Sequence, residues 1–253
     1  MKKYLRTFLT IVSQNKLVYL LAKRVVFDHR AENNCDIDTN GEMRVLKDYL
    51  AGESPVVFDV GANQGDWTKT VLQINGHSIV HAFEPSLKTF EILSANNFPE
   101  NIHLNNLGLG SAVGSQEFFS YGDGSTVNSL YERGETVETK AIKETVNIGT
   151  LDNYCLDNQI TKIDFLKIDV EGNELEVLKG AERLLKSGQV QAMQIEYGGT
   201  YIDAVILLKD VFDYLNGCGE YLFYKIHFNH LEEVSYHKDL ENFQYCNYLV
   251  VKK

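Results

Sequence analysis

The chain has 253 residues, of which 44% are hydrophobic and three are proline, a composition ordinary for one compact domain with a modest extension. A formal net charge of −11 argues against general nucleic-acid binding, which requires a cationic face. The four cysteines are scattered and form no C-x-x-C pair, which argues against a zinc ribbon and a dithiol redox motif. We therefore expect reduced, mostly buried thiols in a cytoplasmic protein.

The first 30 residues contain two short apolar runs flanked by basic residues. Tyr4–Val12 is interrupted at Arg6 and lacks a small-x-small cleavage site, which does not fit a signal peptide. Leu17–Ala22 stops at Lys23, and neither run reaches the roughly 18–20 residues that span a bilayer. The pattern predicts amphipathic helices within a helical extension over residues 1–52. We expect them to pack on the domain or on a second copy of the chain, with weak peripheral membrane contact as the alternative and no stable insertion.

A buried strand followed by a glycine turn is predicted at Val56–Gly65, and a helix opens at Asp66. Apolar runs bounded by glycine are typical of parallel strands covered on both faces. Glycine at Gly61 lets the backbone approach a ligand where a Cβ would collide, beyond the carboxyl end of the strand. The dinucleotide pattern G-x-G-x-x-G is absent, which makes a nicotinamide-dependent oxidoreductase the runner-up only.

The next predicted strand, Ile79–Phe83, ends at Glu84, 23 positions after Gly61. An acid that closes the second strand of such a fold is placed to accept both hydroxyls of a ribose. Together, the glycine turn and this acid indicate a cofactor that contains a nucleoside.

The rest of the chain mostly alternates strands with helices. Further strands are predicted at Ile102–Leu104, Ile163–Val170, Val190–Glu196, Tyr221–Phe228 and Tyr245–Val251.

The central stretch breaks this alternation. Gly108 and Gly110 predict a β-turn into a hairpin. A partial alternation of apolar and polar residues predicts strands at Gln116–Tyr121 and Lys140–Ile148. A polar, glycine-containing stretch from Gly122 to Gly134 separates them. This insertion is expected to be a hairpin added to the sheet, a mobile lid over the site, or both.

Several motifs occur in a specific order along the chain. They are D-V-G-A-N-Q-G at Asp59–Gly65, F-E-P at Phe83–Pro85, T-L-D at Thr150–Asp152, K-I-D-V-E-G-N-E at Lys167–Glu174 and V-L-K-G-A at Val177–Ala181. With these motifs and a strand ending at Glu196, the chain from about Val56 to Glu196 resembles the FkbM family of S-adenosylmethionine-dependent methyltransferases.

The resemblance implies a fold and an activity. The fold is α/β, a Rossmann-like class I methyltransferase domain over residues 53–253, with a seven-stranded, mostly parallel sheet, helices on both faces and the last strand reversed. Members of the family generally methylate hydroxyl oxygens of sugars or natural products. A small-molecule or glycan acceptor is therefore expected, with S-adenosyl-L-methionine as the methyl donor and no nucleic acid as partner.

The resemblance also implies roles for individual residues around the cofactor. The methionine part would lie along the turn, the ribose on the acid after the second strand and the adenine beside the residues after the third strand. The implied residues are Asp59, which positions the turn, Gly61, Asn63 and Gly65 for the methionine, Glu84 for the ribose, and Asn105, Asn106 and Leu107 for the adenine. S-adenosylmethionine has no pyrophosphate, so a phosphate-binding loop is unnecessary.

Methyl transfer to a hydroxyl is helped by a general base that takes its proton. Asp169 and Glu171, which leave a predicted strand at the crevice, are the first candidates, and Glu196 is the next. Glu171 and Glu174 also fit acids that interact favourably with a helix N-terminus, and Asp169 fits a group that holds a turn or the cofactor's amino group. The three candidate bases also offer hard oxygen ligands, but no metal is assigned to them.

Other polar and aromatic residues have a plainer explanation. His227 and His230 lie at and just after the end of a predicted strand and are expected to be surface or packing residues rather than bases. Tyr197 and Tyr201 fit either sugar stacking or the core. A catalytically silent interaction module on the same fold stays a third hypothesis, although such a module would not need the glycine turn and the ribose acid together.

Overall fold

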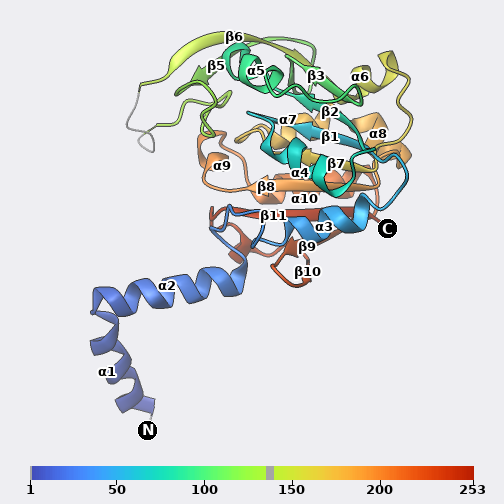
Figure 1. Ribbon diagram of the computed structural model, residues 1–253. Helices are drawn as coiled ribbons and strands as arrows, with labels where there is room; N and C mark the ends of the chain where they lie inside the picture. The colour runs from blue at the N-terminus through green and yellow to red at the C-terminus, as the bar shows by residue number, and fades with distance from the viewer. Residues whose placement is uncertain (1, 135–139) are drawn as a thin grey trace.

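The computed structural model describes residues 2–134 and 140–253, and an eight-stranded sheet forms its centre (Figure 1). The sheet order is β10-β9-β11-β8-β7-β1-β2-β3. The strands are β1 (Val56–Val60), β2 (Ile79–Phe83), β3 (Ile102–Asn105), β7 (Phe165–Ile168), β8 (Ala192–Tyr197), β9 (Tyr221–Ile226), β10 (Leu231–Val234) and β11 (Cys246–Lys252). Strands β3, β2, β1, β7 and β8 are parallel neighbours, whereas β11 runs antiparallel to both β8 and β9.

The expected count of seven strands was wrong by one. The additional strand is β10, which pairs antiparallel with β9 at the edge of the sheet. Its centre, Glu232 and Glu233, is exposed and charged, so it shows none of the apolar alternation that predicts a strand. Charged residues on an edge strand also disfavour pairing with another chain.

Helices cover both faces of the sheet because successive residues of each strand point to opposite sides. In β1, Phe58 lies in a core cluster with Leu178 of α7, whereas Val57 lies in a second cluster with Val45 of α3 and Val71 of α4. Helices α6, α7, α8 and α10 contribute to the first cluster. The helices of the domain are α3 (Glu42–Tyr49), α4 (Asp66–Ile74), α5 (Leu87–Ser94), α6 (Leu151–Asp157), α7 (Glu174–Lys179), α8 (Glu182–Ser187), α9 (Thr200–Asp203) and α10 (Leu208–Cys218), with a 3₁₀ turn at Lys238–Leu240.

The central insertion forms a separate three-stranded sheet, ordered β4-β6-β5, rather than an addition to the main one. Its strands are β4 (Gly108–Leu109), β5 (Gly114–Ser120) and β6 (Ile142–Gly149). The predicted hairpin of β5 and β6 is present, but the turn predicted at Gly108 was wrong, because β4 pairs parallel with β6. A Cβ on Gly108 would come within 2.7 Å of the Ile148 side chain, so glycine permits this close approach.

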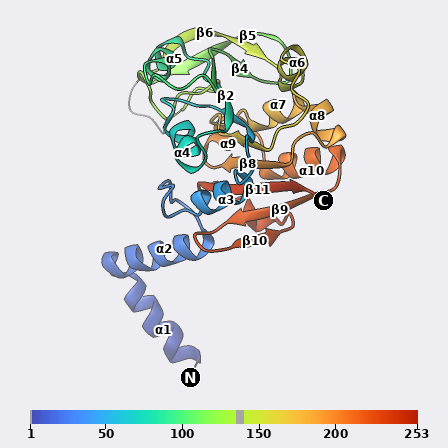
Figure 2. The ribbon, with the colours of Figure 1, turned by 45° about the vertical axis from the view of Figure 1, so that its right-hand side comes forward.

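Helices α1 (Lys2–Ser13) and α2 (Lys16–Arg30) extend away from the sheet domain (Figures 1 and 2). Of the two expected modes of packing, burial of α2 on this domain was wrong, because none of its residues is buried, and packing on a second copy stays a prediction. By contrast α3, although within residues 1–52, packs Val45 and Leu46 into the core. Met1 lies outside the described residues. Among the helices that the structure describes, none has the length and apolar character needed to cross a bilayer.

Candidate functional site

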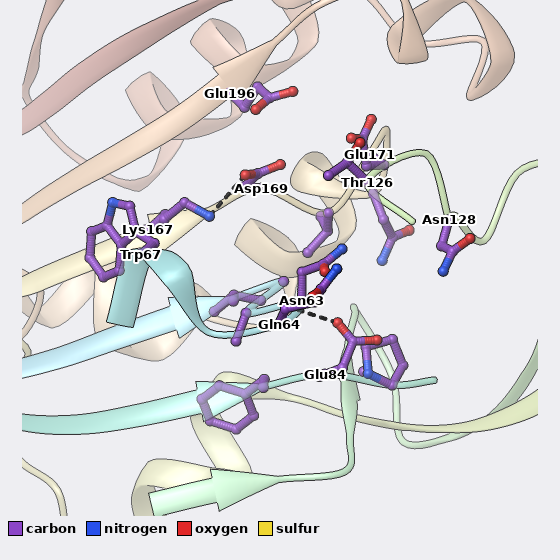
Figure 3. Close-up of a pocket in the computed structure, with 18 of the residues that line it drawn as sticks. Asn63, Gln64, Trp67, Glu84, Thr126, Asn128, Lys167, Asp169, Glu171 and Glu196 are labelled. Carbon is purple, nitrogen blue, oxygen red and sulfur yellow. Dashed lines mark hydrogen bonds and ion pairs between the residues drawn. The ribbon is translucent and has the colours of Figure 1, made fainter. Parts of the chain in front are cut away.

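A cavity of about 510 Å³ opens beyond the carboxyl ends of β1, β2, β7 and β8 (Figure 3). Residues at these strand ends form its floor. Two further segments line it, the loop before α3 with Cys35 and Ile37, and the connection between β5 and β6 with Ser125 and Asn128. This is the position at which open α/β sheets bind ligands, as the sequence predicts.

The glycine turn after β1 passes close to other backbone segments. Gly61 has a φ of 87°, and a Cβ there would lie 1.8 Å from the carbonyl oxygen of Asp169. Gly65 has a φ of 88°, and its Cβ would meet the Leu93 side chain at 2.7 Å. Gly61 and Asn63 line the cavity. Gly65 does not line it, and its missing side chain leaves room for Leu93 of α5 to pack against the turn. Both glycines are therefore required by backbone geometry, and of the two only Gly61 lines the cavity.

Asp59 lies beneath the turn and not in the cavity lining. Its carboxylate is fully buried and accepts a hydrogen bond of 2.7 Å from the Thr68 hydroxyl. Its second oxygen lies 3.6 Å from the Lys167 ammonium. Asp59 thus connects β1, α4 and β7. Its role in positioning the turn for the cofactor stays a prediction.

Glu84 lies at the end of β2 and faces the cavity with only 5% of its surface exposed. One of its oxygens accepts the backbone N–H of Asn63 at 3.1 Å (Figure 3). The other accepts the backbone N–H of Ser86 at 2.9 Å. Burial raises the pKa of Glu84 to about 7, although these two N–H donors lower it. Because a carboxylate oxygen has two lone pairs, each oxygen keeps capacity to accept a hydroxyl.

Of the three residues expected beside the adenine, only Leu107 lines the cavity. The Asn105 side chain donates instead to the carbonyl of Ala82 at 3.1 Å. The Asn106 side chain donates to the carbonyls of Glu84 and Pro85, each at 3.0 Å. The two asparagines therefore hold the end of β2 in place. Leu107 belongs to an apolar wall that also includes Phe83, Leu109 and Phe118.

Three carboxylates meet on the opposite side of the cavity. Ligand oxygens of Asp169, Glu171 and Glu196 all lie within 4.8 Å of one another (Figure 3). The sequence left their mutual geometry open, and the fold brings them together because β7 and β8 are parallel neighbours that end at the same edge. Such an oxygen set could hold a divalent cation.

Basic residues offset part of this negative charge. The Lys167 ammonium lies 2.8 Å from an oxygen of Asp169 and is itself buried. Burial alone would lower the pKa of Lys167, but the carboxylates of Asp169 and Asp59 raise it overall, so this side chain stays cationic. The Arg133 guanidinium donates to Glu171 and lies 3.6 Å from Asp203.

The remaining acids have raised pKa values for a common reason. Burial and the Asp169 carboxylate raise the pKa of Glu171 to about 8, against the lowering effect of Arg133. Burial, Asp169 and Glu171 also raise the pKa of Glu196 well above its ordinary value. Perturbed acids that converge on a cavity are typical of functional sites.

Residues 121–134, here called the strap, cross one side of the cavity. Asn63 donates to the carbonyl of Ser125 at 3.1 Å, which joins the strap to the glycine turn. At the other end, the Ser129 hydroxyl donates to the carbonyl of Glu171 at 2.7 Å, and Arg133 contacts its carboxylate. The strap therefore links the turn after β1 to the carboxylates after β7.

Other candidate residues have structural roles. Glu174 is almost fully buried and accepts backbone N–H groups of Val170 and Gly172, so it holds the turn after β7. Tyr197 and Tyr201 are fully buried in the core and contact each other edge to face. The rings of His227 and His230 stack on each other, and neither residue lines the cavity.

Sequence reasoning missed several residues of the cavity. They include Trp67, Phe118, Lys167, Glu42 and Tyr245, together with the strap and its anchor Arg133. Lys167 lies inside an apolar strand motif, two residues before Asp169, and this position is a signal that could have found it. Glu42, Phe118 and Tyr245 reach the cavity through long-range packing, which no local pattern shows.

The strand order, the reversed β11 and the crevice at the carboxyl ends define a class I methyltransferase fold with one added edge strand. The Methyltransferase FkbM domain matches residues 59–249, so the chain belongs to the FkbM family of methyltransferases.

Named relatives agree with this family. Hexuronic acid methyltransferase AglP of Haloferax volcanii is 31% identical over 179 residues, which are 68% of this chain and 70% of the relative. Methyltransferase sdnD of Sordaria araneosa is 30% identical over 158 residues, which are 51% of this chain and 61% of the relative.

A solved structure supports the fold alone. The crystal structure of methyltransferase FkbM from Methylobacillus flagellatus aligns with a TM-score of 0.50 and 18% identity over 78% of this chain. The alignment covers 44% of that protein, so the present chain spans less than half of its length.

Proposed function

We propose that the protein transfers a methyl group from S-adenosyl-L-methionine to a hydroxyl oxygen of a sugar, a glycan or a small metabolite. The observation that carries this proposal is the placement of Glu84. A buried carboxylate at the end of β2 faces the same cavity as the glycine turn and the cluster of Asp169, Glu171 and Glu196.

The residues present fit S-adenosylmethionine. Glu84 has two oxygens with free lone pairs for the ribose hydroxyls, and the apolar wall of Phe83, Leu107 and Phe118 suits a purine ring. The carboxylates across the cavity are favourable for a ligand with a sulfonium and an ammonium group. Gly61 leaves the backbone of the turn accessible where a side chain would not fit. When bound, the cofactor supplies an electrophilic methyl group.

The residues of the chain would position the acceptor and take its proton. Alignment of the reacting groups can supply much of the rate acceleration, and a general base adds about 10²–10⁴-fold. Lys167 binds Oδ2 of Asp169, which leaves Oδ1 to receive the hydroxyl proton. Glu171 is engaged by Arg133, and Glu196 lies beside both acids. We therefore assign the base to Asp169, with Glu171 and Glu196 as groups that bind the acceptor or share the proton.

The acceptor class rests on the family relative. AglP is named a hexuronic acid methyltransferase, which favours a saccharide acceptor for this chain also. The runner-up, a nicotinamide-dependent oxidoreductase, would require the dinucleotide glycine pattern that the turn lacks. A silent interaction module would not explain why raised-pKa acids converge on the cavity.

A radiolabelled methyl-transfer assay against a panel of glycans and polyols tests the proposal. We expect methylation of at least one saccharide hydroxyl by the purified protein. The Asp169→Asn variant should lose turnover by about 10²-fold or more, and its cofactor affinity should fall far less, because Glu171 and Glu196 keep their carboxylates. Equal losses of turnover and affinity would make Asp169 a structural residue. Transfer to an amine or a carboxylate alone would contradict hydroxyl specificity.

A further inference from the structure

Helices α1 and α2 expose apolar side chains to an extent that a monomeric protein surface rarely does. Several of these side chains are more than half exposed, and none of the residues of α2 is buried. The exposed apolar residues are Tyr4, Leu9, Ile11, Leu17, Tyr19, Leu21 and Val25. The sheet domain does not cover these helices (Figures 1 and 2).

Helix α2 carries a row of apolar residues and, on its opposite side, a row of basic residues. Leu17, Leu21 and Val25 recur every four residues and share one side of the helix. Lys16, Lys23 and Arg30 recur every seven residues and lie on the other side. All six side chains are exposed. The ion pair of Arg24 and Asp28 lies on the same side as Leu17 and Leu21, and the opposite side carries the three cations together with further apolar residues. Helix α2 is therefore rich in exposed apolar side chains and has a row of cations along one side.

Helix α1 has the same character. Tyr4 and Ile11 lie seven residues apart on one side, and both are exposed. Lys2 and Arg6, four residues apart, lie on another side. The first turn and the last turn carry no acidic residue that would neutralise them.

The charge of this segment is opposite to that of the rest of the chain. Residues 2–30 contain seven Lys and Arg residues and one acidic residue, Asp28. The remainder contains 17 basic and 34 acidic residues. Two copies of the segment would bring like charges together, which disfavours self-association through these helices. An apolar face flanked by lysine and arginine instead suits a surface that is apolar beneath and anionic above.

We propose that residues 2–30 bind the surface of an anionic lipid bilayer, with both helices lying in the interfacial plane. At about 1.5 Å per residue, the 12 residues of α1 and 15 of α2 are each shorter than the roughly 30 Å of a bilayer core. The helices therefore lie on the membrane and do not cross it.

This contact would hold the cavity near the lipid. The end of α2 is fixed to the sheet domain by a buried ion pair of 3.0 Å between Glu32 and Lys225, and by a hydrogen bond from Asn33 to the carbonyl of Tyr245. Tyr245 and the neighbouring Cys35 both line the cavity. The membrane-binding helices are thus connected directly to one wall of the site.

Vesicle co-sedimentation of the full chain tests the proposal. The vesicles contain either phosphatidylcholine alone or phosphatidylcholine with 30% phosphatidylglycerol, at low and at high salt. We expect binding to the anionic vesicles that weakens with salt, and little binding to the neutral ones. The test variant is Lys16→Gln/Lys23→Gln/Arg30→Gln, and the control is Lys88→Gln/Lys143→Gln/Lys186→Gln, which removes three exposed charges from the sheet domain.

The test variant should bind anionic vesicles about 100-fold less tightly, since each basic residue near such a surface contributes about fivefold. The control should bind as the unmodified protein does. A second variant, Leu17→Ser/Leu21→Ser, should weaken binding through the apolar face without a change in charge. Absence of binding to anionic vesicles at low salt, or equal loss in the control, would overturn the proposal. Sedimentation of a dimer that the Leu17→Ser/Leu21→Ser variant dissociates, without vesicle binding, would identify a second copy as the partner instead.

Discussion

At the scale of single residues, the chemistry of the site depends on where each carboxylate is held. Glu84 stands alone at the end of β2 with two backbone N–H donors. Asp169, Glu171 and Glu196 stand together across the cavity, with Lys167 and Arg133 as cationic partners. One carboxylate is thus suited to bind neutral hydroxyls, whereas the cluster is suited to hold and move a proton.

Replacement of Glu84 by alanine should weaken cofactor binding. If the carboxylate accepts two ribose hydroxyls, its loss costs roughly 1–3 kcal/mol, measured by isothermal titration calorimetry with S-adenosylmethionine or S-adenosylhomocysteine. Glu91→Ala, on the exposed side of α5, serves as the control. Unchanged affinity in the Glu84→Ala variant would remove Glu84 from the proposed role.

Cofactor affinity should also depend on pH. The pKa of Glu84 is raised to about 7 by burial, so the carboxyl is largely protonated at pH 6 and ionised at pH 8. The ionised form accepts more hydrogen bonds, so affinity should rise between pH 6 and pH 8 and level off above. Binding at pH 7 should release protons, which titrations in buffers of different ionisation enthalpy detect. A flat profile in the unmodified protein would show that Glu84 does not bind the ligand in its ionised form.

At the scale of secondary-structure elements, the turn after β1 depends on close backbone contacts. Gly61→Ala would place a Cβ 1.8 Å from a carbonyl oxygen at a φ that favours glycine. We expect a loss of about 2–5 kcal/mol in the free energy of unfolding, measured by urea denaturation. Gly52→Ala is the matched control, because no atom lies within 4 Å of its Cβ, and it should change stability by less than about 0.5 kcal/mol. Equal stability of the two variants would contradict the described turn.

Elements with a clear apolar pattern could be predicted from the sequence. Strand β1 and the glycine turn lie where the pattern of Val56–Gly65 places them, because buried strands are apolar on both faces. Strand β10 could not be predicted, since an exposed edge strand has no such pattern. The arrangement of β4, β5 and β6 in a second sheet could not be predicted either, because pairing between distant segments leaves no local signal in the sequence.

The residues of the site also divide into those that local motifs predicted and those that they did not. Local motifs placed Glu84 and Asp169 at strand ends that meet at one edge of the sheet. Arg133 was missed because a lone arginine in a polar stretch looks like a surface residue until its buried contacts with Glu171 and Asp203 are seen. Asn105 and Asn106 lie close to the predicted adenine site, but their amide groups bind backbone carbonyls.

At the scale of the whole molecule, acidic and basic residues are divided between two parts of the chain. The acidic sheet domain carries the cavity, and the cationic helices α1 and α2 stand outside it (Figure 1). The strap joins the glycine turn to the carboxylate cluster, and Tyr245 joins the base of α2 to the same cavity. The proposed cofactor site, the proposed acceptor site and the proposed membrane contact therefore converge on one side of the sheet.

The most direct measurement is a crystal structure of the full chain with S-adenosylhomocysteine. The proposed function predicts that the ribose hydroxyls lie on Glu84, that the adenine packs against Leu107 and Phe118, and that the sulfur faces Asp169. An empty cavity at saturating ligand, or a ligand bound elsewhere on the protein, would contradict it.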